Sequence, residues 1–251
     1  MVIKPEFVER LPQKKEQILI KSSSYYMNNR EVFVEFINSL FEPYKDELQR
    51  LDGKLDSSSK DRELFTHQKI VRDYLNLYTP YRGLLLYHGL GSGKTCSSIA
   101  IAEGMKSSKN ILIMTPAALR MNYIQQLMEC GDQIFKKNQY WEFVDAIDDN
   151  TIRQLSKILS LPYDNIQKNK GAWLVDMKKT SNFDTLTLED KNSLEKQIIQ
   201  MIRFKYEFLN YNGLRDDRWG QLTNHGTQNP FNNKVIIIDE AHNFESRIVH
   251  K

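Results

Sequence analysis

Eight residues in the first half of the chain have the types and spacing that bind phosphate groups. They follow an apolar run at 83–87 and are, in order, His88, Gly89, Leu90, Gly91, Ser92, Gly93, Lys94 and Thr95. Closely spaced glycines let the backbone bend around an anion and direct successive N–H groups at it. A helix beginning near Gly93 would add its positive end, Lys94 would reach the β- and γ-phosphates, and Thr95 would ligate Mg²⁺. The pattern predicts a loop for ATP and Mg²⁺, with His88 standing where such loops usually open with glycine.

A second group of chemically active residues lies near the end of the chain. Four β-branched residues at 235–238 predict a buried strand, and Asp239 and Glu240 follow it directly. Ligands of open α/β sheets bind at the carboxyl ends of strands. We expect Asp239 to hold the Mg²⁺ that Thr95 also contacts, and Glu240 to polarise the water that attacks the γ-phosphate. Lys94 and Glu240 are therefore the predicted catalytic residues, acting through positioning and charge neutralisation.

The elements that must position these residues alternate between strand and helix. The apolar patterns predict strands at 83–88, 110–115, 206–211 and 235–238, and helices at 65–77, 95–106, 117–128, 155–161 and 187–205. Thr187 is the expected N-cap of the last helix, with Asp190 three residues later. Continuous apolar strands that alternate with helices indicate a parallel sheet covered on both faces, so the predicted class is α/β.

The first 60 residues are predicted to form a helical extension. Apolar residues recur at helical spacing from Arg30 to Leu51, and Pro43 is expected to divide this segment into two helices. The polar, serine-containing stretch at 52–61 has the composition of a linker. We therefore place a domain boundary near residue 60, which leaves 61–251 as the nucleotide-binding domain.

Two basic clusters stand out in the long segment between 129 and 233. They are Lys168-Asn169-Lys170 and Lys178-Lys179. We interpret both as solvated surface rather than as nucleic-acid contacts. The net charge of the 251-residue chain is only +3, which is too small to indicate nucleic-acid binding by itself.

The two chemically active motifs together resemble motifs I and II of superfamily 2 helicases and translocases, in the DEAH-box form. The matching residues are Gly91 to Thr95 and Asp239-Glu240-Ala241-His242. The resemblance implies a RecA-like P-loop NTPase lobe. It also implies a nucleic-acid contact in the segment that is similar to motif Ia, where Thr115, Pro116 and Arg120 stand. Gln68 resembles the glutamine that reads adenine in that superfamily.

Three further segments are similar to the helicase-like ATPases of nucleocytoplasmic large DNA viruses, including the poxvirus early-transcription-factor type. They are 83–89, 206–214 and 229–234, and His88 also resembles that group. This narrower resemblance implies DNA or RNA as a partner, together with viral transcription machinery. No stretch is apolar enough to cross a membrane, and the N-terminus lacks the apolar core of a secretory signal. We therefore expect no membrane partner and a cytoplasmic setting, in the host cytoplasm or the virion.

A helicase motor of this superfamily has a second RecA-like lobe that supplies arginines to the ATP site. The later motifs of the superfamily do not follow Asp239 in this chain, so we expect it to be the first, incomplete lobe of a larger protein. Alone it should hydrolyse ATP slowly or not at all. The alternative is a non-catalytic nucleotide-binding module of a transcription complex. A small-molecule kinase is disfavoured, because no acceptor site or lid is evident. DNA versus RNA and the polarity of movement stay open.

Overall fold

The computed structural model describes residues 4–12, 30–51, 66–75, 81–87, 89 and 91–244. They belong to two compact units. One unit combines Met1–Lys14 with Asn110–Lys251, and the other is Lys15–Lys109. The domain boundary that we expect near residue 60 lies outside the described residues and stays a prediction.

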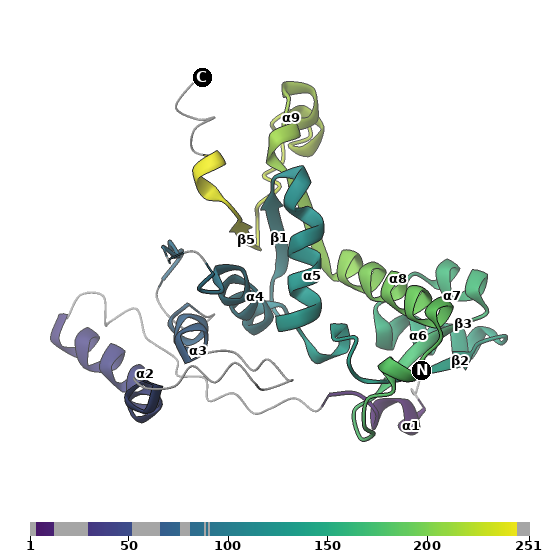
Figure 1. The fold of residues 1–251 in the computed structure, drawn as a ribbon. Helices are drawn as coiled ribbons and strands as arrows, with labels where there is room; N and C mark the ends of the chain where they lie inside the picture. The colour runs from purple at the N-terminus through teal and green to yellow at the C-terminus, as the bar shows by residue number, and fades with distance from the viewer. Residues whose placement is uncertain are drawn as a thin grey trace. The chain divides into compact units, whose positions relative to one another are not determined.

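A three-stranded parallel sheet forms the centre of the larger unit (Figure 1). β1 (Asn110–Thr115) lies between β4 (Tyr206–Asn210) and β5 (Lys234–Ile238). The register pairs Ile113 of β1 with Phe208 on one side and with Ile237 on the other. The predicted α/β class and parallel sheet are therefore confirmed, and the strands predicted at 110–115, 206–211 and 235–238 all form.

The burial of each strand follows its place in this sheet. Five of the six β1 residues are buried. In β5, by contrast, Ile236 and Ile238 are each 39% exposed. In the described part of the sheet β5 pairs with β1 only. The prediction of a buried strand at 235–238 is wrong in this respect, because β-branched residues favour a strand but only neighbours on all sides bury it.

Side chains from β1 and β4 form a core cluster near the carboxyl ends of these strands. Its buried members are Leu112, Met114, Leu209 and Tyr211, and partly buried Leu214, Leu222, Phe231 and Phe244 pack against them. Leu112 and Met114 share one face of β1 because alternate residues of a strand point the same way. The short helix α9 (Asp216–Leu222) contributes to the cluster through Leu222.

Two long helices of this unit contact each other, and one of them also contacts β4. α5 (Arg120–Cys130) follows a 3-10 turn at Ala117–Leu119, so the helix predicted at 117–128 begins three residues late. α8 (Leu188–Lys205) leads directly into β4. The Thr187 hydroxyl accepts a hydrogen bond from the Asp190 N–H at 3.2 Å, which confirms the predicted N-cap. α8 extends from the sheet towards a smaller sheet in the same unit (Figure 1).

This smaller sheet consists of two antiparallel strands that the sequence patterns did not predict. We call it the hairpin, although its strands are joined by a long connection that contains two helices. β2 (Tyr140–Asp145) pairs antiparallel with β3 (Gly171–Asp176). The connection between them contains α6 (Asp149–Leu159) and α7 (Tyr163–Asn169). The N-terminal α1 (Pro5–Val8) precedes Arg10, whose carbonyl accepts a hydrogen bond from the Met177 N–H at 3.0 Å. The hairpin is thus the point to which the start of the chain is attached.

Carboxamide side chains occupy both edges of this hairpin. On β2, Asn182 accepts from the Trp141 N–H at 2.8 Å and donates to the Trp141 carbonyl at 2.9 Å. On β3, Gln197 accepts from the Trp173 N–H and donates to the Trp173 carbonyl, both at 2.8 Å. Each amide replaces the hydrogen bonds that a further strand would make. A two-stranded sheet, which is marginal by itself, is closed in this way.

We predict different costs for removing these two amides. Gln197 is 9% exposed, so Gln197→Leu leaves a buried N–H and carbonyl of Trp173 without partners. The free energy of unfolding should fall by about 2–4 kcal/mol. Asn182→Leu acts at a part-buried pair that water can reach, and should cost about 1 kcal/mol or less. Urea unfolding followed by circular dichroism measures both, and equal costs would contradict the assigned roles.

The smaller unit contains three helices among its described residues. They are α2 (Arg30–Leu51), α3 (Thr66–Tyr74) and α4 (Lys94–Met105), and α3 contacts both of the others. α2 is continuous through Pro43, so the predicted division into two helices is wrong. Pro43 is exposed, and the carbonyl that loses its helical donor there can be hydrated.

Aromatic and charged side chains join α2 and α3. The Tyr44 hydroxyl donates to the Asp73 carboxylate, and burial together with this carboxylate raises the pKa of Tyr44 to about 12. Tyr74 stacks on Tyr81 with a ring-centroid distance of 4.2 Å. These contacts fix α3, the helix on which the phosphate loop rests.

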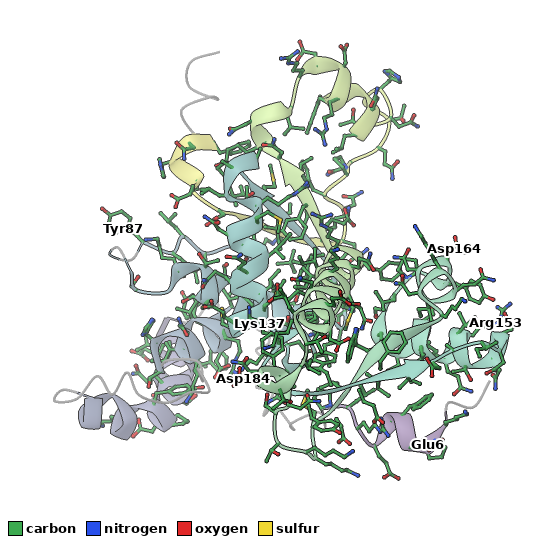
Figure 2. The ribbon with its side chains drawn as sticks, turned by 45° about the vertical axis from the view of Figure 1, so that its right-hand side comes forward. Glu6, Tyr87, Lys137, Arg153, Asp164 and Asp184 are labelled. Carbon is green, nitrogen blue, oxygen red and sulfur yellow. The ribbon has the colours of Figure 1, made fainter. Side chains whose placement is uncertain are left out.

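The apolar run before the phosphate loop does not form the predicted strand at 83–88. Residues 81–87 have no regular secondary structure, and His88 lies outside the described residues. Leu85 is 79% exposed. Tyr87, which is labelled in Figure 2, is 92% exposed. None of the described strands pairs with this segment. An apolar run becomes a strand only when its N–H and carbonyl groups find a neighbouring strand.

Candidate nucleotide-binding site

Residues 91–93 of the predicted phosphate loop lead directly into α4, as the sequence predicts. Gly91 and Gly93 both have φ of +78°, a left-handed conformation that glycine adopts without steric cost. Gly93 is the N-cap of α4, so Lys94 and Thr95 are the first two residues of the helix. The first turn of a helix directs N–H groups and a partial positive charge out of its end. This geometry suits an anion such as a phosphate group.

α3 holds the loop in place through two neighbouring side chains. The Gln68 amide donates to the Gly93 carbonyl at 3.2 Å, and Gln68 is only 3% exposed. The His67 Nε2 atom lies 2.9 Å from the Ser92 carbonyl oxygen. Two consecutive carbonyls of the loop therefore rest on α3. The sequence suggested adenine recognition for Gln68, and the hydrogen bond to Gly93 is a contact that sequence reasoning missed.

The loop also makes contacts within itself. The Ser92 hydroxyl donates to the Gly89 carbonyl at 2.8 Å. The Lys94 ammonium donates to the same carbonyl at 3.3 Å, which places the positive charge over the loop. The N–H groups of a helix N-terminus and an ammonium group are donors that suit a triphosphate, and the glycines let the backbone bend around it. His88 and Leu90, also predicted to bind the nucleotide, lie outside the described residues.

We predict that alanine is tolerated less well at Gly93 than at Gly91. Both positions have the same left-handed φ, so both substitutions should cost about 1–2 kcal/mol in backbone strain. At Gly93 an added Cβ would also lie 2.4 Å from Gln68 Nε2, whereas at Gly91 it meets nothing within 4 Å. Gly93→Ala should therefore lower the free energy of unfolding further, by about 1–2 kcal/mol, as the displaced Gln68 loses its hydrogen bond.

Urea unfolding of the single variants and of Gly93→Ala combined with Gln68→Ala provides the check. The extra cost at Gly93 should disappear when Gln68 is already truncated. Equal costs at Gly91 and Gly93 would contradict the close approach of Gln68 to the loop.

The acidic residues lie at the carboxyl end of the parallel sheet, as predicted. The Asp239 N–H donates to the Met114 carbonyl at 2.9 Å, which extends the pairing of β5 with β1 by one residue. The chain then turns sharply, because Glu240 has φ of +53°. The Asn243 N–H closes this turn on the Glu240 carbonyl at 2.9 Å. The His242 Nδ1 atom lies 3.3 Å from the Glu240 carboxylate.

Tyr211 ties this acidic turn to β4. Its hydroxyl lies 3.1 Å from the Asp239 carbonyl and 3.2 Å from the Glu240 carbonyl, to which it donates. The ring is 2% exposed and meets Phe244 edge to face at a centroid distance of 5.4 Å. Tyr211 thus reaches from beyond β4, past β1, to the end of β5. The partners of its hydroxyl are backbone carbonyls, so residue spacing gave no sign of this role.

We predict that Tyr211→Phe lowers the free energy of unfolding by about 1 kcal/mol, because two part-buried carbonyls lose a shared donor. Tyr163→Phe is the matched control. That hydroxyl bonds Asp149 at an exposed position, and its loss should cost less than about 0.5 kcal/mol. Denaturant unfolding of the two variants measures both losses. An unchanged stability of Tyr211→Phe would contradict the role of this hydroxyl in holding the acidic turn.

The predicted nucleic-acid residues lie at the end of β1 and the start of α5. Thr115 is 2% exposed, and its hydroxyl donates to the Pro116 carbonyl at 2.8 Å. Pro116 is buried as well. The Arg120 guanidinium donates to the Phe208 carbonyl at 3.0 Å and lies 5.5 Å from the centroid of the Phe208 ring. These contacts join α5 to β4, and the nucleic-acid role of the three residues stays a prediction.

The sheet brings Thr115 and Asp239 to one edge, but the phosphate loop belongs to the other unit. Among the described residues, no group of three or more His, Cys, Asp or Glu side chains could hold a metal ion. In the part of the chain that the structure describes, no helix could span a bilayer.

Comparison with known proteins points to viral relatives. A protein of Acanthamoeba polyphaga mimivirus, provisionally named ATP-dependent RNA helicase R563, is 29% identical over 167 residues, which are 63% of this chain and 29% of the relative. The provisionally named helicase 087L of Invertebrate iridescent virus 3 is 25% identical over 233 residues, 87% of this chain and 19% of the relative. The provisionally named helicase 009L of Frog virus 3 (isolate Goorha) is 40% identical over 77 residues, 29% of this chain and 8% of the relative.

These similarities support a helicase-like family of viral proteins. The chain spans less than a third of the length of each of these relatives. No protein-family model matches the chain. No solved structure matches it either.

Proposed function

We propose that this chain is the ATP-binding lobe of a nucleic-acid-dependent ATPase of superfamily 2, in the DEAH-box form, with a RecA-like fold. The observation that carries the proposal is the glycine loop at the N-terminus of α4, with the Lys94 ammonium over it. The acidic turn at the carboxyl edge of a parallel sheet supports it. The helicase names of the viral relatives favour this motor function over a non-catalytic module.

Each residue of the two motifs has a chemical role in this proposal. The glycine loop and the α4 N-terminus bind the phosphates of ATP, and Lys94 neutralises charge that develops on the β- and γ-phosphates. Gln68 supports the loop and contacts adenine. Glu240 orients and polarises the attacking water. Mg²⁺, held through Thr95 and Asp239, would supply further neutralisation of phosphate charge.

The proposal also includes partners that bind outside the ATP site. We propose that Thr115, Pro116 and Arg120 border the path of a DNA or RNA strand. A second RecA-like lobe outside this chain would complete the ATP site, in keeping with the greater length of the relatives. A viral transcription complex in the host cytoplasm or the virion is the proposed setting.

We predict that Lys94→Ala weakens binding of a fluorescent ATP analogue to the purified chain by at least about tenfold, which is about 1.4 kcal/mol. The lost ammonium lies over the loop that receives the phosphates. Lys205→Ala removes the same charge from an exposed position at the end of α8 and should leave the affinity within about twofold. Equal affinities for Lys94→Ala and the parent would contradict the proposed site.

We predict that Glu240→Gln separates binding from hydrolysis. In a protein that contains this chain with its second lobe, kcat should fall by about 10²- to 10⁴-fold, because the water loses its general base. The affinity for ATP should change little, since Glu240 does not bind phosphate in the proposal. Steady-state hydrolysis with saturating single-stranded nucleic acid measures kcat. An unchanged kcat would contradict the proposed motor function.

A further inference from the structure

A polar groove lies between the β2–β3 hairpin and α8. Its volume is about 490 Å³, which is within the usual range of ligand sites. Both of its walls belong to the larger unit. Among its lining residues are Phe143, Asn169, Trp173, Asn192, Lys196 and Gln200. The groove therefore combines aromatic rings, carboxamides and a cation.

One aromatic ring of the groove is both exposed and fixed in position. Phe143 is 39% exposed, although its register partner Trp173 on β3 is only 6% exposed. The two rings meet edge to face at a centroid distance of 5.4 Å. A Cβ atom at Gly171 would lie 2.7 Å from the Phe143 ring, so the ring lies over a position without a side chain. A fixed, accessible ring is a stacking surface for a flat ligand.

Lysines stand in the lining of the groove and next to it in the sequence. Lys196 lines it, and Lys168 and Lys170 stand on either side of the lining residue Asn169. No ion pair joins these three lysines to another described residue. Glu189 is the single acid among the lining residues. All three lysines are exposed, so their charges are accessible to an anionic partner.

The second basic cluster of the sequence is engaged within the protein. Lys178 pairs with Glu9 at 3.2 Å. Lys179 pairs with Asp176 at 3.7 Å and lies 4.5 Å from the centroid of the Tyr140 ring. The two clusters, which the sequence led us to treat alike as solvated surface, therefore differ. Lys168 and Lys170 form no ion pair with a described residue, whereas Lys178 and Lys179 each form one.

We propose that this groove binds single-stranded nucleic acid. A base stacks on Phe143, the amides of Asn169 and Asn192 hydrogen-bond to base edges, and Lys168, Lys170 and Lys196 contact phosphates. A single strand is favoured over a duplex because an aromatic ring reaches the face of a base only when that base is unstacked. The site is separate from the proposed ATP site and requires no nucleotide.

Fluorescence anisotropy of labelled 15-nucleotide dT and U strands, with a duplex of equal length, tests the proposal on the whole chain without nucleotide. Phe143→Leu should weaken single-strand binding by about 5- to 150-fold, the range for loss of one stacked base. Phe143→Tyr, which keeps the ring, should bind within about twofold of the parent. The duplex should bind more weakly than either single strand, and the dT and U arms show which sugar is preferred.

The basic clusters supply a matched pair of variants with equal charge change. Lys168→Gln with Lys170→Gln should weaken binding and reduce the slope of log affinity against log salt by about 1.4, or about 0.7 for each lost phosphate contact. Lys178→Gln with Lys179→Gln should leave affinity and slope nearly unchanged. Circular dichroism confirms that each variant is folded.

Several results would overturn the proposal. They are the absence of binding by the parent chain, equal losses for the two lysine pairs, and full affinity in Phe143→Leu. Lys94→Ala should leave strand binding unchanged while it weakens binding of the ATP analogue. These two binding measurements therefore distinguish a wrong proposal for the groove from a wrong proposal for the ATP site.

Discussion

The pairing of β1 with β4 on one side and β5 on the other is the constraint on which the acidic half of the proposed site depends. Parallel pairing brings the carboxyl ends of three distant segments to one edge of the sheet. The hydrogen bond from the Asp239 N–H to the Met114 carbonyl continues this pairing into the acidic turn. Tyr211 then secures the turn from the far side of β1. The position of Glu240 is therefore determined by backbone geometry rather than by side-chain contacts alone.

The phosphate loop depends on a different kind of constraint. Its left-handed glycines allow the bend, and α3 fixes that bend through Gln68 and His67. The Lys94 ammonium donates a hydrogen bond back to the Gly89 carbonyl of the loop. A loop that is already shaped for an anion loses less conformational entropy when it binds one. α3 is therefore as much a part of the proposed site as the loop itself.

Local patterns predicted the features that local physics determines. The β-branched run before Asp239 and the apolar run of β1 each become a strand, and Thr187 caps its helix. The predictions fail where contacts with residues distant in the sequence determine the structure. Among the described strands, none pairs with residues 83–87, and β5 pairs with β1 alone. The hairpin was missed because Phe143 is exposed on β2 while the amides that close its edges, Asn182 and Gln197, come from distant positions.

The central proposal is that the glycine loop and the acidic turn bind one ATP molecule. Hydrogen–deuterium exchange of the chain, with and without a slowly hydrolysed ATP analogue and Mg²⁺, tests this claim most directly. We expect the analogue to slow amide exchange both in residues 89–97 and in residues 238–243, with no comparable change in the β2–β3 hairpin. Protection of the loop alone would mean that the acidic turn takes no part in binding. Protection of neither segment would contradict a nucleotide site in this chain.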